Sequence, residues 1–179
     1  MAMLSQNGYQ GISVARFDGP YPRLRRVQVP GTDRMFVVRD GSTGFLLCHM
    51  ALWWHDEVYP LNKGVFDDWS WAWRVIAGSS RLSNHASATA IDINATRAPM
   101  GVPIARVFKV NEIAAIRRRT KFYHGTVRWG GEWDRPDGMH IEISASLSDC
   151  EKRARELMDT PRGKLLLDAN PGLAKVILS

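Results

Sequence analysis

The apolar residues of this chain fall into short runs with either helical or alternating spacing. Residues 44–59 are almost continuously apolar and are followed by Pro60, which predicts a mostly buried helix. Residues 69–76 alternate, with a tryptophan at three successive odd positions, and this predicts a half-buried strand. Further strands are expected at 35–39, 123–129 and 139–143. Together these elements predict the α+β class.

Turn and capping residues divide the rest of the chain. Residues 1–34 are rich in Gly, Pro and Arg, which predicts an irregular arm laid on the domain. Asn111 is expected to cap a helix at about 112–120. Ser148 and Glu151 have the spacing of a capping box for the next helix. We therefore expect three parts: an N-terminal arm at 1–34, one domain at 35–160 and a packed tail at 161–179.

Length and charge narrow the class of protein. At 179 residues the chain has the usual size of one domain, and its formal charge of +6 favours an anionic partner. Nucleic acid, a membrane surface and an anionic cell-wall polymer all fit that charge. The run Arg117–Arg119 gives little support to nucleic acid, because no aromatic residues are interleaved with it and cations suit a helix end.

Targeting segments and thiol sites are not indicated. The first residues lack a basic region followed by an apolar run, and no stretch approaches the ~20 apolar residues of a membrane span. We therefore expect synthesis in the cytoplasm without a signal peptide. Cys48 and Cys150 are far apart and form no CxxC pair, which argues against a disulfide framework and a thiolate zinc site.

Two histidines are expected to be structural or surface residues. His49 and His55 both fall in the predicted helix 44–59 and lie six residues apart. Residues with that spacing do not share a helix face, so they are unsuited to binding one metal ion together.

Two other stretches, 83–94 and 137–143, carry the candidate chemistry. Alternate residues of a strand share a face, so Asp92 and His140 would each lie on a polar face whose reverse carries isoleucines. If the two strands lie side by side, these side chains can converge on a site backed by a core. His85 precedes Asp92 by an odd number of residues, so it must reach that site from a loop.

Two imidazoles and one carboxylate form a set suited to tetrahedral zinc with the fourth position open. Asp137, three residues before His140, is the candidate general base. Arg74 is the first candidate for stabilising an oxyanion, and Arg81 is its alternative. Plainer readings exist, since His-x6-Asp pairs arise freely in loops, Asp137 could begin a simple turn, and Arg74 could pair with any acid. The joint pattern favours the metal site, because the same stretches supply ligands, base and apolar backing.

The segments 83–92 (SNHASATAID) and 137–140 (DGMH) resemble paired signatures of one zinc peptidase family. These signatures are S-x-H-x-x-G-x-A-x-D and D/E-x-x-H, and the family includes D-alanyl-D-alanine carboxypeptidases, VanY and L-alanyl-D-glutamate peptidases. Residues 81–100 and 128–143, with WGGEW at 129–133, look especially like the peptidase domains of phage endolysins.

The resemblance covers roughly residues 70–145 and implies an α+β fold with a small antiparallel sheet flanked by helices, as in hedgehog and D,D-peptidase domains. It implies three zinc ligands: His85, Asp92 and His140. It also implies that Asp137 is the general base and that Arg74 stabilises the oxyanion. Ser83 and Trp133, which stand within the two matching stretches, are expected to contact the substrate.

One position departs from the first signature, because Ala88 stands where the family usually has glycine. If the backbone here requires a positive φ, alanine strains it by about 1 kcal/mol or more. We therefore expect a local difference in the loop between His85 and Asp92, with the ligands unaffected.

The resemblance implies hydrolysis of peptide bonds that involve D-amino acids in peptidoglycan. We expect a monomeric, phage endolysin-type L-alanyl-D-glutamate endopeptidase that reaches the bacterial cell wall after release, where its charge favours anionic polymers. The nearest alternative is a D,D-carboxypeptidase or D,D-endopeptidase of the same family. A non-catalytic wall-binding module is the second alternative, and a nucleic-acid binder is the most distant.

Overall fold

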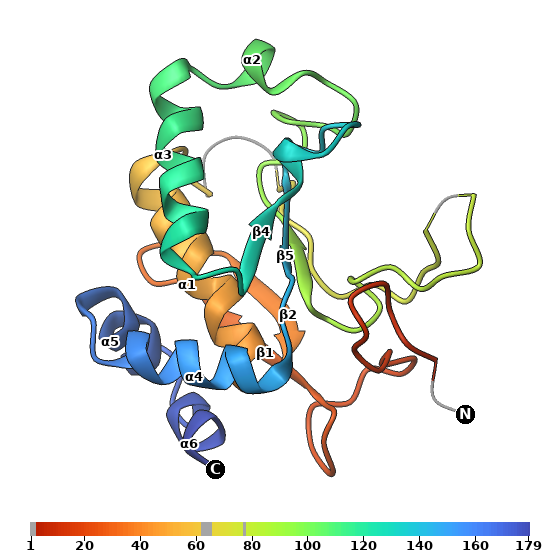
Figure 1. Ribbon diagram of the computed structural model, residues 1–179. Helices are drawn as coiled ribbons and strands as arrows, with labels where there is room; N and C mark the ends of the chain where they lie inside the picture. The colour runs from red at the N-terminus through yellow and green to blue at the C-terminus, as the bar shows by residue number, and fades with distance from the viewer. Residues whose placement is uncertain (1–2, 62–65, 77) are drawn as a thin grey trace.

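The computed structural model describes residues 3–61, 66–76 and 78–179, so the predicted arm is described only from residue 3. Helices pack beside two small antiparallel sheets, which confirms the predicted α+β class (Figure 1). The strands are β1 (Leu24–Gln28), β2 (Met35–Arg39), β3 (Ala90–Asp92), β4 (Val127–Trp129) and β5 (His140–Ile143). The helices are α1 (Ser42–Glu57), α2 (Ile104–Val107), α3 (Val110–Phe122), α4 (Leu147–Met158), α5 (Pro161–Asp168) and α6 (Leu173–Leu178), with a 3-10 turn η1 (Gly130–Glu132). Within the described ranges, no helix has both the length and the apolar character that a membrane span needs.

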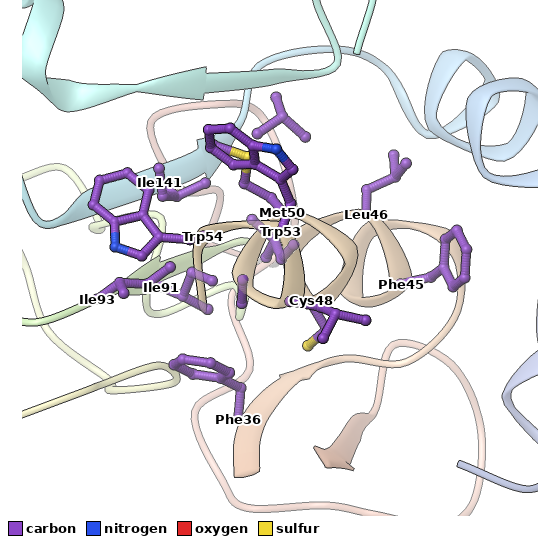
Figure 2. Close-up of a cluster of buried hydrophobic side chains, with 14 of the residues drawn as sticks. Phe36, Phe45, Leu46, Cys48, Met50, Trp53, Trp54, Ile91, Ile93 and Ile141 are labelled. Atoms are coloured by element: carbon purple, nitrogen blue, oxygen red, sulfur yellow. The ribbon is translucent and has the colours of Figure 1, made fainter. Parts of the chain in front are cut away.

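Helix α1 is the centre of the core. Every residue from Ser42 to Trp54 is buried, as expected for a helix that is apolar on all sides. Figure 2 shows side chains of β2, β3 and β5 gathered around it, including Phe36, Ile91 and Ile141. The helix predicted at 44–59 is confirmed, and it supports the sheets that flank it.

The three-stranded sheet has the order β3-β5-β4, with both pairs antiparallel. Asp92 of β3 is the direct partner of His140 of β5. Ile91 and Ile141 are also partners, and both are fully buried on the opposite face. The expectation that Asp92 and His140 share one face of adjacent strands, with isoleucines behind them, is therefore confirmed.

Two sequence predictions about strands were wrong. The N-terminal arm contains β1, which pairs with β2 along its whole length. Residues 69–76 form no strand, because only Trp69 and Val75 make isolated bridges, to Asp92 and Leu82 respectively. The backbone of this segment also bonds to other parts of the chain, so no single partner strand continues the ladder. Trp69 and Trp73 are exposed as a result.

Helix starts and ends also differ from the predictions in detail. Helix α3 begins after Lys109 and not after Asn111. Helix α4 is capped by Ser146, whose Oγ accepts the N–H of Asp149 at 3.2 Å, so the capping box predicted at Ser148 was wrong. The strand predicted at 123–129 is shorter, since its first residues form the turn after α3. Both apolar pieces of the tail are helical, as α5 and α6.

His49 is a structural histidine, as expected. It is buried, and its Nδ1 lies 2.8 Å from the Tyr123 hydroxyl and 3.1 Å from an Nη of Arg119. Arginine can only donate, so Nδ1 is an acceptor and the ring is neutral. Burial, reinforced by nearby arginines, lowers the pKa of His49 to about 3.

We predict that His49 makes the fold sensitive to mild acid. Its folded pKa is below the unfolded value of about 6.5, so its stabilisation is complete above pH 6.5 and is lost as pH falls toward 3. Between pH 6.5 and 5 this costs about 2 kcal/mol of unfolding free energy. Urea unfolding at both pH values should show a smaller loss for His49→Asn than for wild type. His124→Asn, at an exposed position, is the control, and an equal loss in all three proteins would contradict the assignment.

Ala88 has a φ of 57°. This position therefore adopts the left-handed backbone conformation that favours the glycine usual at this point of the signature. The residue is fully buried, and its methyl group packs in a small cluster with Ile12 and Leu24. Its carbonyl accepts the N–H of Arg39 at 2.8 Å, which joins the loop to β2. The buried methyl group and this bond offset part of the backbone strain.

We predict that Ala88→Val destabilises the protein by about 3 kcal/mol, because a β-branched residue is strained at positive φ and this position is fully buried. Ala88→Gly should change stability by less than about 1 kcal/mol, since relief of strain opposes the loss of a buried methyl group. Urea unfolding of both variants measures this. Equal stability of Ala88→Val and wild type would show that the loop is not constrained in this way.

Candidate metal centre

Three buried side chains converge at the polar face of the β3–β5 pair. His85 reaches it from the turn before β3, as expected, and Asp92 and His140 come from the paired strands. His140 Nδ1 lies 2.9 Å from Asp92 Oδ1, and His85 Nε2 lies 3.3 Å from Asp92 Oδ2. The two imidazole nitrogens are themselves 3.3 Å apart. The structure therefore brings all three predicted ligands together.

The outer nitrogen of each imidazole is held by another group. His85 Nδ1 lies 2.6 Å from the carbonyl oxygen of Ser70, and His140 Nε2 lies 2.9 Å from Oε2 of Glu142. Both partners are acceptors, so the outer nitrogens carry protons, and the inner nitrogens present lone pairs once their own protons leave. A cation between the two imidazoles and the carboxylate takes the place of those inner protons.

The electrostatics of the cluster favour positive charge at this point. Burial alone would raise the pKa of Asp92, but hydrogen bonds from His140 and His85 hold it well below the usual range. Burial likewise opposes a charge on His140, yet its hydrogen bonds to Asp92 and Glu142 raise the pKa of the imidazole to about 9. The carboxylate is therefore ionised, as a metal ligand must be.

The donor set fits a small divalent cation. Nitrogen and oxygen ligands at about 2.0–2.1 Å from tetrahedral zinc are separated from each other by about 3.3 Å. The two imidazole nitrogens are separated by 3.3 Å, close to that value, and Asp92 presents one oxygen to each of them, at 2.9 and 3.3 Å. Histidine nitrogens whose outer N–H is bound to a carbonyl or a carboxylate are also the usual form in zinc sites. These residues could hold a metal ion without rearrangement of the backbone.

Asp137 lies beside this cluster, in the turn that leads into β5. Its N–H bonds to the carbonyl of Gly130 at 2.9 Å, and its carbonyl accepts the N–H of His140 at 3.2 Å. A side chain at Gly130 would place its Cβ 2.8 Å from the Asp137 carbonyl oxygen, so glycine is required for this close approach. The structure therefore fixes the distance between the turn and the candidate ligand His140.

One oxygen of the Asp137 carboxylate, Oδ1, is buried and has no hydrogen-bond partner in the ranges that the structure describes. Burial raises the pKa of Asp137. The negative charge of Asp92 adds to this effect, whereas the positive charges of His140 and Arg74 oppose it. A buried, unpartnered carboxylate with a raised pKa beside a metal site is a candidate proton acceptor.

The other predicted site residues differ in what surrounds them. Arg74 is exposed, and its positive charge lowers the pKa of Asp137. Arg81 is also exposed, and its backbone N–H donates to Oγ of Ser79. The ring of Trp133 lies 5.1 Å from that of His140 and forms a wall of the site. Ser83 is buried, and its Oγ accepts the N–H of His85 at 3.3 Å, so its visible contact shapes the turn.

The sequence patterns did not single out the residues behind the ligands. Glu142 and Asn84 are buried next to His140, and the exposed Arg128 bonds to Glu142. The available signal was the position of Glu142, two residues after His140 on the same strand face. A carboxylate there is expected to contact the imidazole edge, and a buried one needs further donors.

Comparison with known proteins agrees with this geometry. Residues 77–143 match the family model described as D-alanyl-D-alanine carboxypeptidase. No match was found among curated proteins or among solved structures. The matched segment contains the three candidate ligands and Asp137, and it begins after Arg74. The predicted resemblance is therefore confirmed for residues 77–143, which carry the sequence pattern of the D-alanyl-D-alanine carboxypeptidase family of peptidases.

Proposed function

We propose that this protein is a zinc-dependent peptidase that hydrolyses the stem peptides of peptidoglycan. One observation carries the proposal. Two imidazoles, whose outer nitrogens are hydrogen-bonded, converge with the carboxylate of Asp92, beside the buried Asp137 Oδ1, which has no partner among the described residues. The family match over the same residues supports a peptidase. A binding module would need neither the unpartnered Asp137 nor the oriented lone pairs.

In this proposal His85, Asp92 and His140 hold the zinc ion. Zinc at such a site supplies Lewis-acid polarisation of a carbonyl and lowers the pKa of water toward neutrality. Asp137 accepts the proton of the attacking water and delivers it to the leaving amine nitrogen.

The remaining site residues act on the substrate. Arg74 stabilises the negative charge that develops on the carbonyl oxygen. Trp133 bounds the site on the side of His140 and limits how a peptide can lie against it.

We further propose that the bond hydrolysed is the one between L-alanine and D-glutamate, in the manner of phage endolysins. Support comes from the resemblance of residues 81–100 and 128–143 to endolysin peptidase domains, and from a formal charge of +6, which suits an anionic wall. The second candidate is a D,D-carboxypeptidase, which the description of the matching family model favours.

We predict that Asp137→Asn leaves one zinc ion bound per chain and lowers the rate of peptidoglycan hydrolysis by roughly 10²–10⁴-fold, because the amide cannot accept a proton. Zinc content by elemental analysis and turbidity loss of purified sacculi measure the two effects. Asp134→Asn makes the same change at an exposed position in the preceding loop and should keep full activity. Hydrolysis at the wild-type rate by Asp137→Asn would rule out this base.

We predict that digestion of purified sacculi releases peptides with new D-glutamate amino termini, and that a chelator abolishes the release. Mass spectrometry of the muropeptides, with amino-terminal labelling, identifies the bond. Release of free D-alanine alone would establish the second candidate in place of the first. Intact muropeptides with wild-type zinc content would instead indicate a non-catalytic module.

A further inference from the structure

Glu142 is a buried carboxylate that contacts His140 from behind the proposed metal site. Its Oε2 accepts the Nε2–H of His140 at 2.9 Å and an amide N–H of Asn84 at 2.6 Å. Its other oxygen accepts the Nε–H of Arg128 at 2.5 Å. These three donors fix the carboxylate of Glu142 from three sides.

The amide of Asn84 has only one orientation that satisfies both of its neighbours. Its Oδ1 accepts the backbone N–H of Asn7 at 3.0 Å, and its Nδ2 donates to Glu142. A backbone N–H can only donate and a carboxylate can only accept. A carboxamide joins these two groups, whereas an aspartate of the same shape would place a second negative charge against Glu142.

Asn7 belongs to the N-terminal turn Ser5–Tyr9, which docks on the site sheet. Its Nδ2 donates to Oγ1 of Thr89 at 2.9 Å and to the carbonyl of Ile143 at 3.0 Å. Ser5 Oγ donates to Asn7 Oδ1 at 2.6 Å. Both the oxygen and the nitrogen of the Asn7 side-chain amide are therefore hydrogen-bonded. These bonds hold the residue in place and fix the direction of its backbone N–H.

We propose that Asn84 and Glu142, braced by Arg128 and by the N-terminal turn Ser5–Tyr9, are positioning residues for His140. Glu142 holds the proton of the imidazole on Nε2 and so keeps the Nδ1 lone pair directed at the metal position. Asn84 connects this carboxylate to the N-terminal segment, which makes that segment part of the metal centre. The inference rests on the proposed function, because it concerns the zinc affinity of the same site.

The decisive variant is Asn84→Asp, which keeps the shape of the side chain, removes the donor to Glu142 and places a second negative charge against it. We expect zinc to bind 10–100-fold more weakly, the usual cost of losing an outer contact to a metal ligand. Competition with a chromophoric chelator measures the affinity. The visible absorption spectrum of the cobalt-loaded variant should also change, which a loss of stability alone would not cause. Asn111→Asp, at the exposed start of α3, makes the same charge change and should bind zinc as wild type does.

A surface variant keeps the inference testable if Asn84→Asp does not fold. Arg128 has a side chain that is 47% exposed, so Arg128→Met should fold and should weaken zinc binding several-fold by freeing one oxygen of Glu142. Arg117 is 54% exposed and is paired with Glu132, so Arg117→Met is the matched control that should have no effect. Glu142→Gln should retain more zinc affinity than Glu142→Ala, because its amide oxygen can still accept from His140.

The outcomes separate the two proposals. Wild-type zinc affinity and an unchanged cobalt spectrum in Asn84→Asp and Arg128→Met would overturn the positioning role while leaving the proposed function intact. Absence of zinc binding by the wild-type chain would overturn the proposed function, and this inference with it. Weaker binding in both variants, with unaffected controls, supports the role assigned to Asn84 and Glu142.

Discussion

The pairing of Asp92 with His140 across β3 and β5 is the constraint on which the rest of the site depends. A slip of one residue in this register would place the two side chains on opposite faces of the sheet, with one of them in the core beside α1. The register is held by the buried partners Ile91 and Ile141, and reciprocal backbone bonds with Trp69 hold Asp92 on the other edge of β3. Burial of the isoleucines against α1 thus fixes the position of two polar side chains on the other face.

Once these two residues are fixed, the surrounding groups decide what the cluster can bind. Ser70 and Glu142 occupy the outer nitrogens of His85 and His140, so the inner lone pairs must point toward Asp92. The carboxylate of Asp92 attracts positive charge in this buried site, carried either by protons on the imidazoles or by a cation bound in their place. Metal binding and stability of the fold are therefore expected to be coupled. The polar chain from Glu142 to the N-terminal turn extends the same constraint to the start of the described chain.

Local patterns were sufficient to predict the α+β class, the central helix and the convergence of the ligand set. The apolar run of α1 and the alternation in β5 are strong signals, because burial on one or all sides leaves its period in the sequence. The strand predicted at 69–76 was wrong although the alternation is present in the sequence, because the backbone bonds of this segment are divided among several neighbours. The strand β1 was missed because Gly and Pro precede it and because two of its five residues, Arg25 and Arg26, are charged. Asn7 and Asn84 could not have been paired from sequence, since their contact joins residues 77 positions apart through a single amide.

X-ray absorption spectroscopy of the purified, zinc-loaded protein tests the central claim most directly. The account predicts one zinc ion per chain with only nitrogen and oxygen neighbours at about 2.0–2.2 Å, and outer-shell scattering from two imidazoles. His140→Ala should remove the signal of one imidazole. Sulfur neighbours from Cys48 or Cys150, scattering that does not change in His140→Ala, or a chain that retains no zinc would contradict a metal centre built from His85, Asp92 and His140.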